Sequence, residues 1–145
     1  MILSVPLTPA RSIMTLLAAP AEAETDHPVK ISSSEATALL TGPAAVSGGK
    51  NGSQTKWGEM LASTDRKLSA GIYSSTAIHS EIEAYGEDEF MYFIAGGITL
   101  TSADGTVTEI KAGDGVTIPK GWKGVWDTQG YTKYYVTYEP EGAAE

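Results

Sequence analysis

The 145-residue chain has no cysteine and only two histidines, His27 and His79. Without thiols, the sequence excludes disulfide scaffolds, cysteine nucleophiles and cysteine-ligated zinc sites. Two imidazoles also leave little material for the metal and proton chemistry that histidine usually supplies. No apolar run is long enough to cross a bilayer. The chain is long enough for one domain with a single core and too short for two ordinary ones.

Basic residues are also few. The chain has 10 Lys and Arg against 18 Asp and Glu, which gives a formal net charge of −8. This balance makes nucleic acids and anionic membranes poor partners, so we expect the chain to bind neither. The same charge mildly favours neutral or cationic ligands.

The first residues contain a short apolar run, Ile13 to Ala19, after Arg11. Followed by Ala21-Glu22-Ala23, it is superficially similar to a secretory signal with a cleavage site. The run is short, however, Arg11 is the only positive charge before it, and a glutamate interrupts the cleavage triplet. We therefore expect a cytoplasmic protein whose N-terminal extension lies along the barrel or a partner subunit. Export through residues 1–23 is the alternative.

A short helix is predicted after Ser32, because Glu35 three residues later completes a capping box. Gly42-Pro43 should end this helix, and residues 42–56 are rich in turn-forming types. We expect those residues to form a surface loop, with a lid over a barrel mouth as the alternative. The predicted organisation is an extension with one helix (1–56), a barrel (57–139) and a polar tail (140–145).

From Trp57 onward the pattern is that of short strands. Apolar or alternating runs are interrupted by Gly96-Gly97, Asp104-Gly105 and Gly113-Asp114-Gly115. Such pairs supply the positive φ angles that tight β-turns require. Short strands at this spacing are typical of an antiparallel barrel or sandwich.

The stretch from Glu89 to Gly121 resembles the cupin superfamily. Glu89 lies seven residues before Gly96, and Gly113 is followed after five residues by Pro119-Lys120-Gly121. Over about residues 57–139 the chain is similar to the branch of ethanolamine-utilisation and ureidoglycine aminohydrolase-like cupins. The further matching positions are Tyr92, Asp114, Trp126 and Lys133-Tyr134-Tyr135, with Thr132 where the branch has arginine. The resemblance implies an all-β double-stranded β-helix (a jelly-roll barrel), and a homodimer.

The resemblance also shows what is missing. Metal-binding cupins place His-x-His three or four residues before this glutamate and another histidine three residues after the Pro-x-Gly glycine. Here those positions hold Glu83 and Tyr85, or Ile82 and Ala84, and then Gly124. Only Glu89 remains of the usual four ligands. We therefore expect no metal site of this kind and no cofactor.

The candidate site follows from strand alternation. His79, Glu81, Glu83 and Tyr85 fall on one predicted face, and a hairpin would bring Glu89 opposite them inside the barrel. Carboxylates gathered there would need a proton, a cation or Lys133 to compensate their charge. The predicted catalytic residues are Glu83, Tyr85, Glu89 and, in support, His79. The predicted ligand-binding residues are Glu81, Met91, Phe93, Trp126, Lys133 and Tyr135.

Bland alternatives exist for each part of this site. The acidic face could lie in solvent, Lys133 could form a structural ion pair, and the apolar residues could simply pack in the core. Two functions therefore stay open. One is a small-molecule enzyme performing acid/base chemistry of the lyase, isomerase or hydrolase type. The other is a non-catalytic module that holds a small ligand in the barrel. The carboxylate cluster makes the enzyme the working hypothesis.

Overall fold

The computed structural model describes residues 27–43 and 45–141. The chain divides into two compact units, residues 1–30 and residues 31–145. Of the first unit only residues 27–30 are described, and they form no helix or strand. The expectations for residues 1–23 and for most of the tail lie outside the described residues. No helix in the described part of the chain is long and apolar enough to span a membrane.

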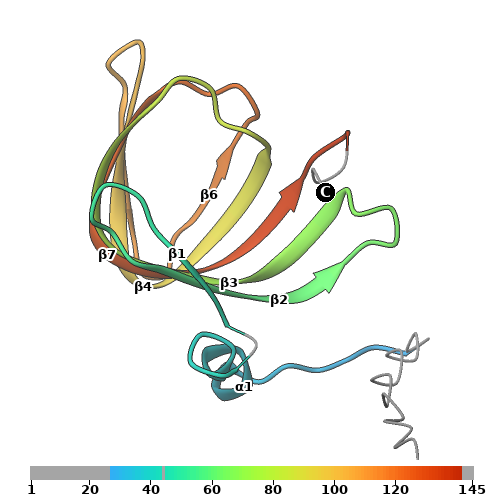
Figure 1. Cartoon of the computed structure of the whole chain (residues 1–145). Coiled ribbons are helices and arrows are strands. Elements are labelled where there is room, and N and C mark those ends of the chain that lie inside the picture. The colour runs from blue at the N-terminus through green and yellow to red at the C-terminus, as the bar shows by residue number, and fades with distance from the viewer. Residues whose placement is uncertain (1–26, 44, 142–145) are drawn as a thin grey trace, which may run out of the picture. The chain divides into compact units, whose positions relative to one another are not determined.

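The second unit is built from strands and one short helix (Figure 1). The elements are α1 (Ser33–Ala38), β1 (Val46–Gly48), β2 (Thr55–Ala62), β3 (Leu68–Ile82), β4 (Asp88–Ser102), β5 (Val107–Lys111), β6 (Gly115–Ile118) and β7 (Gly124–Tyr138). The strands form one antiparallel sheet in the order β1-β2-β3-β7-β4-β5, and β6 pairs with β4. Each of β3, β4 and β7 has 15 residues.

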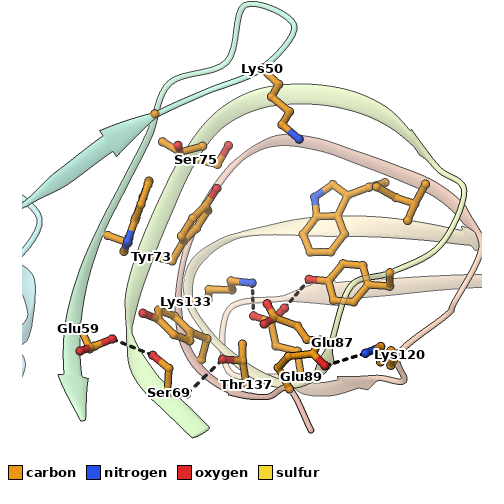
Figure 2. A pocket seen from close by; sticks show the side chains of 18 of the residues that line it. Lys50, Glu59, Ser69, Tyr73, Ser75, Glu87, Glu89, Lys120, Lys133 and Thr137 are labelled. Carbon is orange, nitrogen blue, oxygen red and sulfur yellow. Dashed lines mark hydrogen bonds and ion pairs between the residues drawn. The ribbon is translucent and has the colours of Figure 1, made fainter. Parts of the chain in front are cut away.

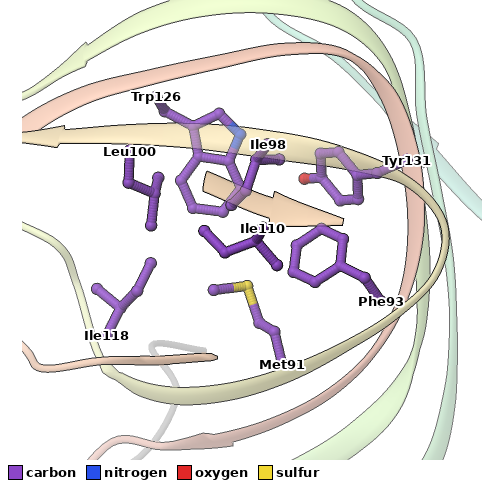
Figure 3. Close-up of a cluster of buried hydrophobic side chains, with 8 residues drawn as sticks. All are labelled: Met91, Phe93, Ile98, Leu100, Ile110, Ile118, Trp126 and Tyr131. Carbon is purple, nitrogen blue, oxygen red and sulfur yellow. The ribbon is translucent and has the colours of Figure 1, made fainter. Parts of the chain in front are cut away.

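The three long strands curve, so that the sheet closes around a core (Figures 1 and 3). The buried side chains of this core are Met91, Phe93, Ile98, Leu100, Ile110, Ile118, Trp126 and Tyr131. They come from β4, β5, β6 and β7, and burying them supplies the main driving force for closing the sheet.

A glycine corner allows this curvature. We expected Gly96-Gly97 to be a turn between two strands, but β4 continues through it. Gly96 has a φ of 65°, and a Cβ atom there would lie 2.0 Å from the carbonyl oxygen of Gly130 on β7. The pairing of β4 with β7 shifts register at this point. The two backbones approach so closely that only glycine fits, and the strand bends instead of ending.

The helix has the predicted cap and covers part of the outer face of the sheet. The Ser32 hydroxyl accepts a hydrogen bond from the Glu35 backbone N–H at 3.3 Å, and the Glu35 carboxylate accepts one from the Ser32 N–H at 2.7 Å. Ala36 and Leu40 are buried against Ile72 of β3. Within the predicted loop of residues 42–56, the structure adds the short edge strand β1.

Candidate functional site

A wide-mouthed cavity of about 1030 Å³ is lined by residues of β2, β3 and β7 and by the beginning of β4. Figure 2 shows polar and charged side chains that line it. Among the predicted site residues, Tyr85, Glu89, Trp126, Lys133 and Tyr135 line this cavity. A cavity of this size is ample for a small organic molecule.

A buried ion pair lies at the wall of the cavity. The Lys133 ammonium is 2.6 Å from Oε1 of Glu89, and the two side chains are only 5% and 4% exposed. The same ammonium donates to the Met91 sulfur at 2.9 Å. Because β4 and β7 are neighbours in the sheet, Glu89 and Lys133 point from adjacent strands to one side. Of the ways to compensate the carboxylate charge that the sequence left open, a proton, a cation or Lys133, the structure shows the ion pair with Lys133.

Tyr85, which lies in the segment between β3 and β4, completes the cluster. Its hydroxyl donates a hydrogen bond to Oε2 of Glu89, so both carboxylate oxygens have a donor. The backbone of Tyr85 is fixed by hydrogen bonds with the Trp122 carbonyl at 2.8 Å and the Gly121 N–H at 2.7 Å. Its ring stacks in parallel on Trp126, with centroids 6.2 Å apart. These contacts fix the hydroxyl at the carboxylate.

Three aromatic rings surround the Lys133 ammonium. Its nitrogen lies 5.3 Å from the ring centroid of Tyr73, 5.5 Å from that of Trp126 and 5.8 Å from that of Tyr131. Cation–π attraction of this kind stabilises a charge that has lost its water. The cavity wall therefore accommodates a buried ammonium ion.

Burial sets the protonation preferences of the cluster. It lowers the pKa of Lys133, while the negative charge of Glu89 acts in the opposite direction. The pKa of Tyr85 is raised strongly by burial, then by the charge of Glu89. Burial also raises the pKa of half-buried Glu87, with Glu89 adding to the effect. Burial thus makes Lys133 a stronger acid than an exposed lysine.

His79, Glu81 and Glu83 are not brought to this cavity. All three are exposed, and His79 lies 3.6 Å from Asp127 on the outside of the sheet. The residues of β3 that face inward near its end are Ile78, Ser80 and Ile82.

The prediction of a shared face fails for two physical reasons. Thr76 and Ala77 are both exposed, so the inward face of β3 changes parity after Ser75. The strand then ends at Ile82, and the chain bends at Glu83 and the next residue, so alternation no longer relates Glu83 to Tyr85. The predicted hairpin is absent too, because β7 lies between β3 and β4.

Met91 and Phe93 are fully buried in the core and do not line the cavity, whereas Trp126 does both. Sequence reasoning missed Tyr73, Tyr131 and Glu87. Tyr131 could have been identified, because it alternates with Lys133 and Tyr135 along β7 and strand residues two apart share a face.

The cluster does not fit the usual cupin metal site. Both oxygens of Glu89 accept hydrogen bonds from internal donors, Lys133 and Tyr85. Across residues 27–43 and 45–141, no three His, Cys, Asp or Glu side chains lie close enough together to hold a metal ion. A buried ammonium beside the carboxylate also repels a divalent cation.

A curved antiparallel sheet that wraps around a core and a ligand-sized cavity is the architecture of a cupin barrel, the double-stranded β-helix. Residues 63–135 match the family of the EutQ-like cupin domain, and the chain belongs to this family. No curated protein matches the chain.

Several solved structures share the fold. The EutQ protein of Clostridium difficile aligns with a TM-score of 0.53 and 21% identity over 76% of this chain and 80% of its own. A protein of unknown function from Rhizobium leguminosarum gives a TM-score of 0.55, with 18% identity over 77% and 97% of the two chains. One from Pseudomonas syringae gives 0.60, with 19% identity over 64% of this chain and 43% of that one. At these identities the likeness concerns the fold.

Proposed function

We propose that this cupin acts on a small molecule by acid/base chemistry of the lyase, isomerase or hydrolase type, using Glu89, Lys133 and Tyr85. The observation that supports this most is the hydrogen-bonded cluster of the three side chains at the wall of a ligand-sized cavity. Acid and base partners in contact, in a partly dehydrated site, are what proton transfer requires.

Each group has a role that its environment favours. Lys133 acts as the acid, because its lowered pKa brings proton donation closer to the working pH. Glu89 acts as the base, since it is held beside that acid and can receive a proton. Tyr85 stays protonated, because its pKa is raised, and it orients Glu89 through its hydroxyl. A carbonyl oxygen of the substrate would accept a hydrogen bond from Lys133 while Glu89 removes an adjacent proton.

Hydrogen–deuterium exchange at carbon tests this proposal without knowledge of the natural substrate. The protein is incubated in D₂O with pyruvate, acetoacetate or dihydroxyacetone, and loss of the C–H signal is followed by proton NMR. We expect exchange above the buffer rate for at least one compound, and a loss of about 100-fold or more in Glu89→Gln and Lys133→Met. His79→Gln is the matched control, since His79 is exposed and does not line the cavity.

Equal exchange in the parent and in both variants would contradict the proposal. Melting curves check that each variant is folded, and Tyr85→Phe gives a second, milder test of the same cluster. An absence of exchange for all three compounds would favour the second candidate function, a non-catalytic ligand-binding module. That candidate is supported by the complete internal pairing of Glu89, which needs no substrate to satisfy it.

A homodimer is part of the same proposal. The outer face of β4 and β7 exposes Phe90, Tyr92, Val136 and Tyr138, each 39% to 46% exposed. Phe90 and Val136 are direct register partners, so the apolar side chains are contiguous across the two strands. A second copy is the favoured occupant, because these four side chains carry no charge and offer two strongly negative chains an apolar surface on which to meet. We expect a dimer in light scattering and a monomer for Phe90→Glu, with Thr108→Glu on β5 as the control.

A further inference from the structure

Lys50 lies in the turn between β1 and β2 and lines the same cavity. Figure 2 shows its side chain directed from this turn over the cavity mouth. The turn is fixed by Ser53, whose hydroxyl donates to the Lys50 carbonyl at 2.7 Å and accepts from the Lys50 N–H at 3.1 Å. Within the part of the chain that the structure describes, the Lys50 ammonium has no hydrogen bond or ion pair. A fixed backbone thus presents an unpaired cation to the cavity.

The other cations near the cavity differ from Lys50. Lys133 is paired with Glu89, and Lys120 is paired with Glu139 at 2.7 Å. Arg66 and its neighbour Lys67 belong to the turn after β2, whereas Lys50 precedes that strand. Lys50 is therefore the cation available at its end of the cavity.

The wall below Lys50 is both aromatic and hydroxylated. Trp57, Tyr73 and Tyr131 form a ladder of stacked rings, with successive centroids 6.1 Å apart. Ser75 and Thr55 are buried lining residues of the same wall. A ligand with a flat apolar body would pack against the rings and direct polar atoms to the hydroxyls.

We infer that the cavity binds a small organic monocarboxylate with a planar body, and that Lys50 anchors its carboxylate at the mouth. This inference rests on the proposed function only in requiring that the cavity hold a small molecule. One ammonium matches one negative charge, and the net charge of −8 opposes the entry of dianions such as phosphate esters. The ligand class differs from the neutral or cationic one expected from composition, because Lys50 presents an unpaired positive charge at its end of the cavity. Lys50 also lies outside the family match at residues 63–135, so the family does not imply this role.

Benzoate and benzamide form a matched pair of probes with the same size and shape and different charge. Their dissociation constants are measured by NMR titration of the full chain at pH 7 and low salt. We expect benzoate to bind about tenfold more tightly than benzamide, as one charge-assisted hydrogen bond allows. Lys50→Met should remove this preference and Lys50→Arg should keep it. Lys56→Met is the control, because Lys56 is exposed on β2 and does not line the cavity.

Three results would overturn the inference: equal binding of the two probes, an unchanged preference in Lys50→Met, or no benzoate binding up to tens of millimolar. Loss of the preference in Lys56→Met as well would also count against it, because it would indicate attraction by overall charge. A failure of the acid/base function looks different. It would leave the Lys50-dependent benzoate preference intact while Glu89→Gln and Lys133→Met show no effect on carbon exchange.

Discussion

Two acidic segments separated by three residues end in opposite environments. Glu81, near the end of β3, and Glu83, just after it, are exposed, whereas Glu87 is half-buried and Glu89, at the start of β4, is 6% exposed. The residue type is the same in both segments. The two segments differ in the orientation of their side chains and in the residues that those side chains contact. Only Glu89 meets a lysine and a tyrosine, and this contact makes it a candidate for chemistry.

The largest effect on stability should come from removing Lys133, the cation that pairs with buried Glu89. Lys133→Met leaves the Glu89 charge buried without its ion-pair partner, which should cost about 3–5 kcal/mol of unfolding free energy. Urea denaturation at pH 7 measures the loss. The double variant Lys133→Met/Glu89→Gln should recover part of it, since neither charge remains. A single variant as stable as the parent would show that the ion pair is not buried in solution.

Tyr85→Phe tests the buried Glu89 cluster in a second way. It removes one hydrogen bond to a charged group, which should lower the free energy of unfolding by about 1.5–3 kcal/mol near neutral pH. The effect should shrink in alkali. The pKa of Tyr85 is raised in the folded state, so its contribution is complete below the ordinary tyrosine value near 10 and is lost at higher pH. Urea midpoints at pH 8 and pH 11 compare the two proteins. A difference between the two urea midpoints that grows with pH would contradict the burial of this hydroxyl.

Gly121→Val tests the turn that holds Tyr85 in place. Gly121 has a φ of 86° and its N–H donates to the Tyr85 carbonyl, while nothing lies within 4 Å of the position of an added Cβ. The Cβ meets no neighbour, so the expected cost is mainly backbone strain, about 1–2 kcal/mol. A lower melting temperature is the expected readout, and an unchanged one would contradict the turn geometry. Gly86→Ala, with ordinary φ and an open site, is the control.

The smallest effect on stability is expected in the exposed segment of Glu81 and Glu83. Glu83→Gln should change stability by less than about 0.5 kcal/mol and should leave carbon exchange and benzoate binding unchanged. The measurements are those used for the buried cluster. A large loss of exchange in Glu83→Gln would return the site to the exposed face and remove the contrast between the two segments.

Much of the fold could be predicted from local signals. The capping box at Ser32 and Glu35 and the turns at Gly105 and Gly113 depend on neighbouring residues, and each is present. The cupin motif added the jelly-roll topology, which periodicity cannot supply. Prediction failed at Gly96-Gly97, because a positive φ serves a strand corner as well as it serves a turn.

The site was predicted only in part, for a related reason. Tyr85, Glu89 and Lys133 were all named, but their contact depends on β7 lying between β3 and β4, which is a long-range feature. Glu83 and His79 were placed by extending a two-residue period across a bend in β3 and past its end. Periodicity holds only where the strand is continuous, so the error begins where β3 changes face.

The ring of aromatic groups around Lys133 has an optical consequence. Trp126 lies 5.5 Å from the ammonium, and the emission wavelength of indole responds to a nearby electric charge. The chain has three tryptophans, so replacing Trp57 and Trp122 with phenylalanine would leave Trp126 as the sole tryptophan. Its emission would then respond to the charges of the Lys133, Glu89 and Tyr85 cluster. Trp126 thus places an intrinsic fluorophore in the candidate site. Its emission offers a label-free way to follow the deprotonation of Lys133 and the binding of a ligand.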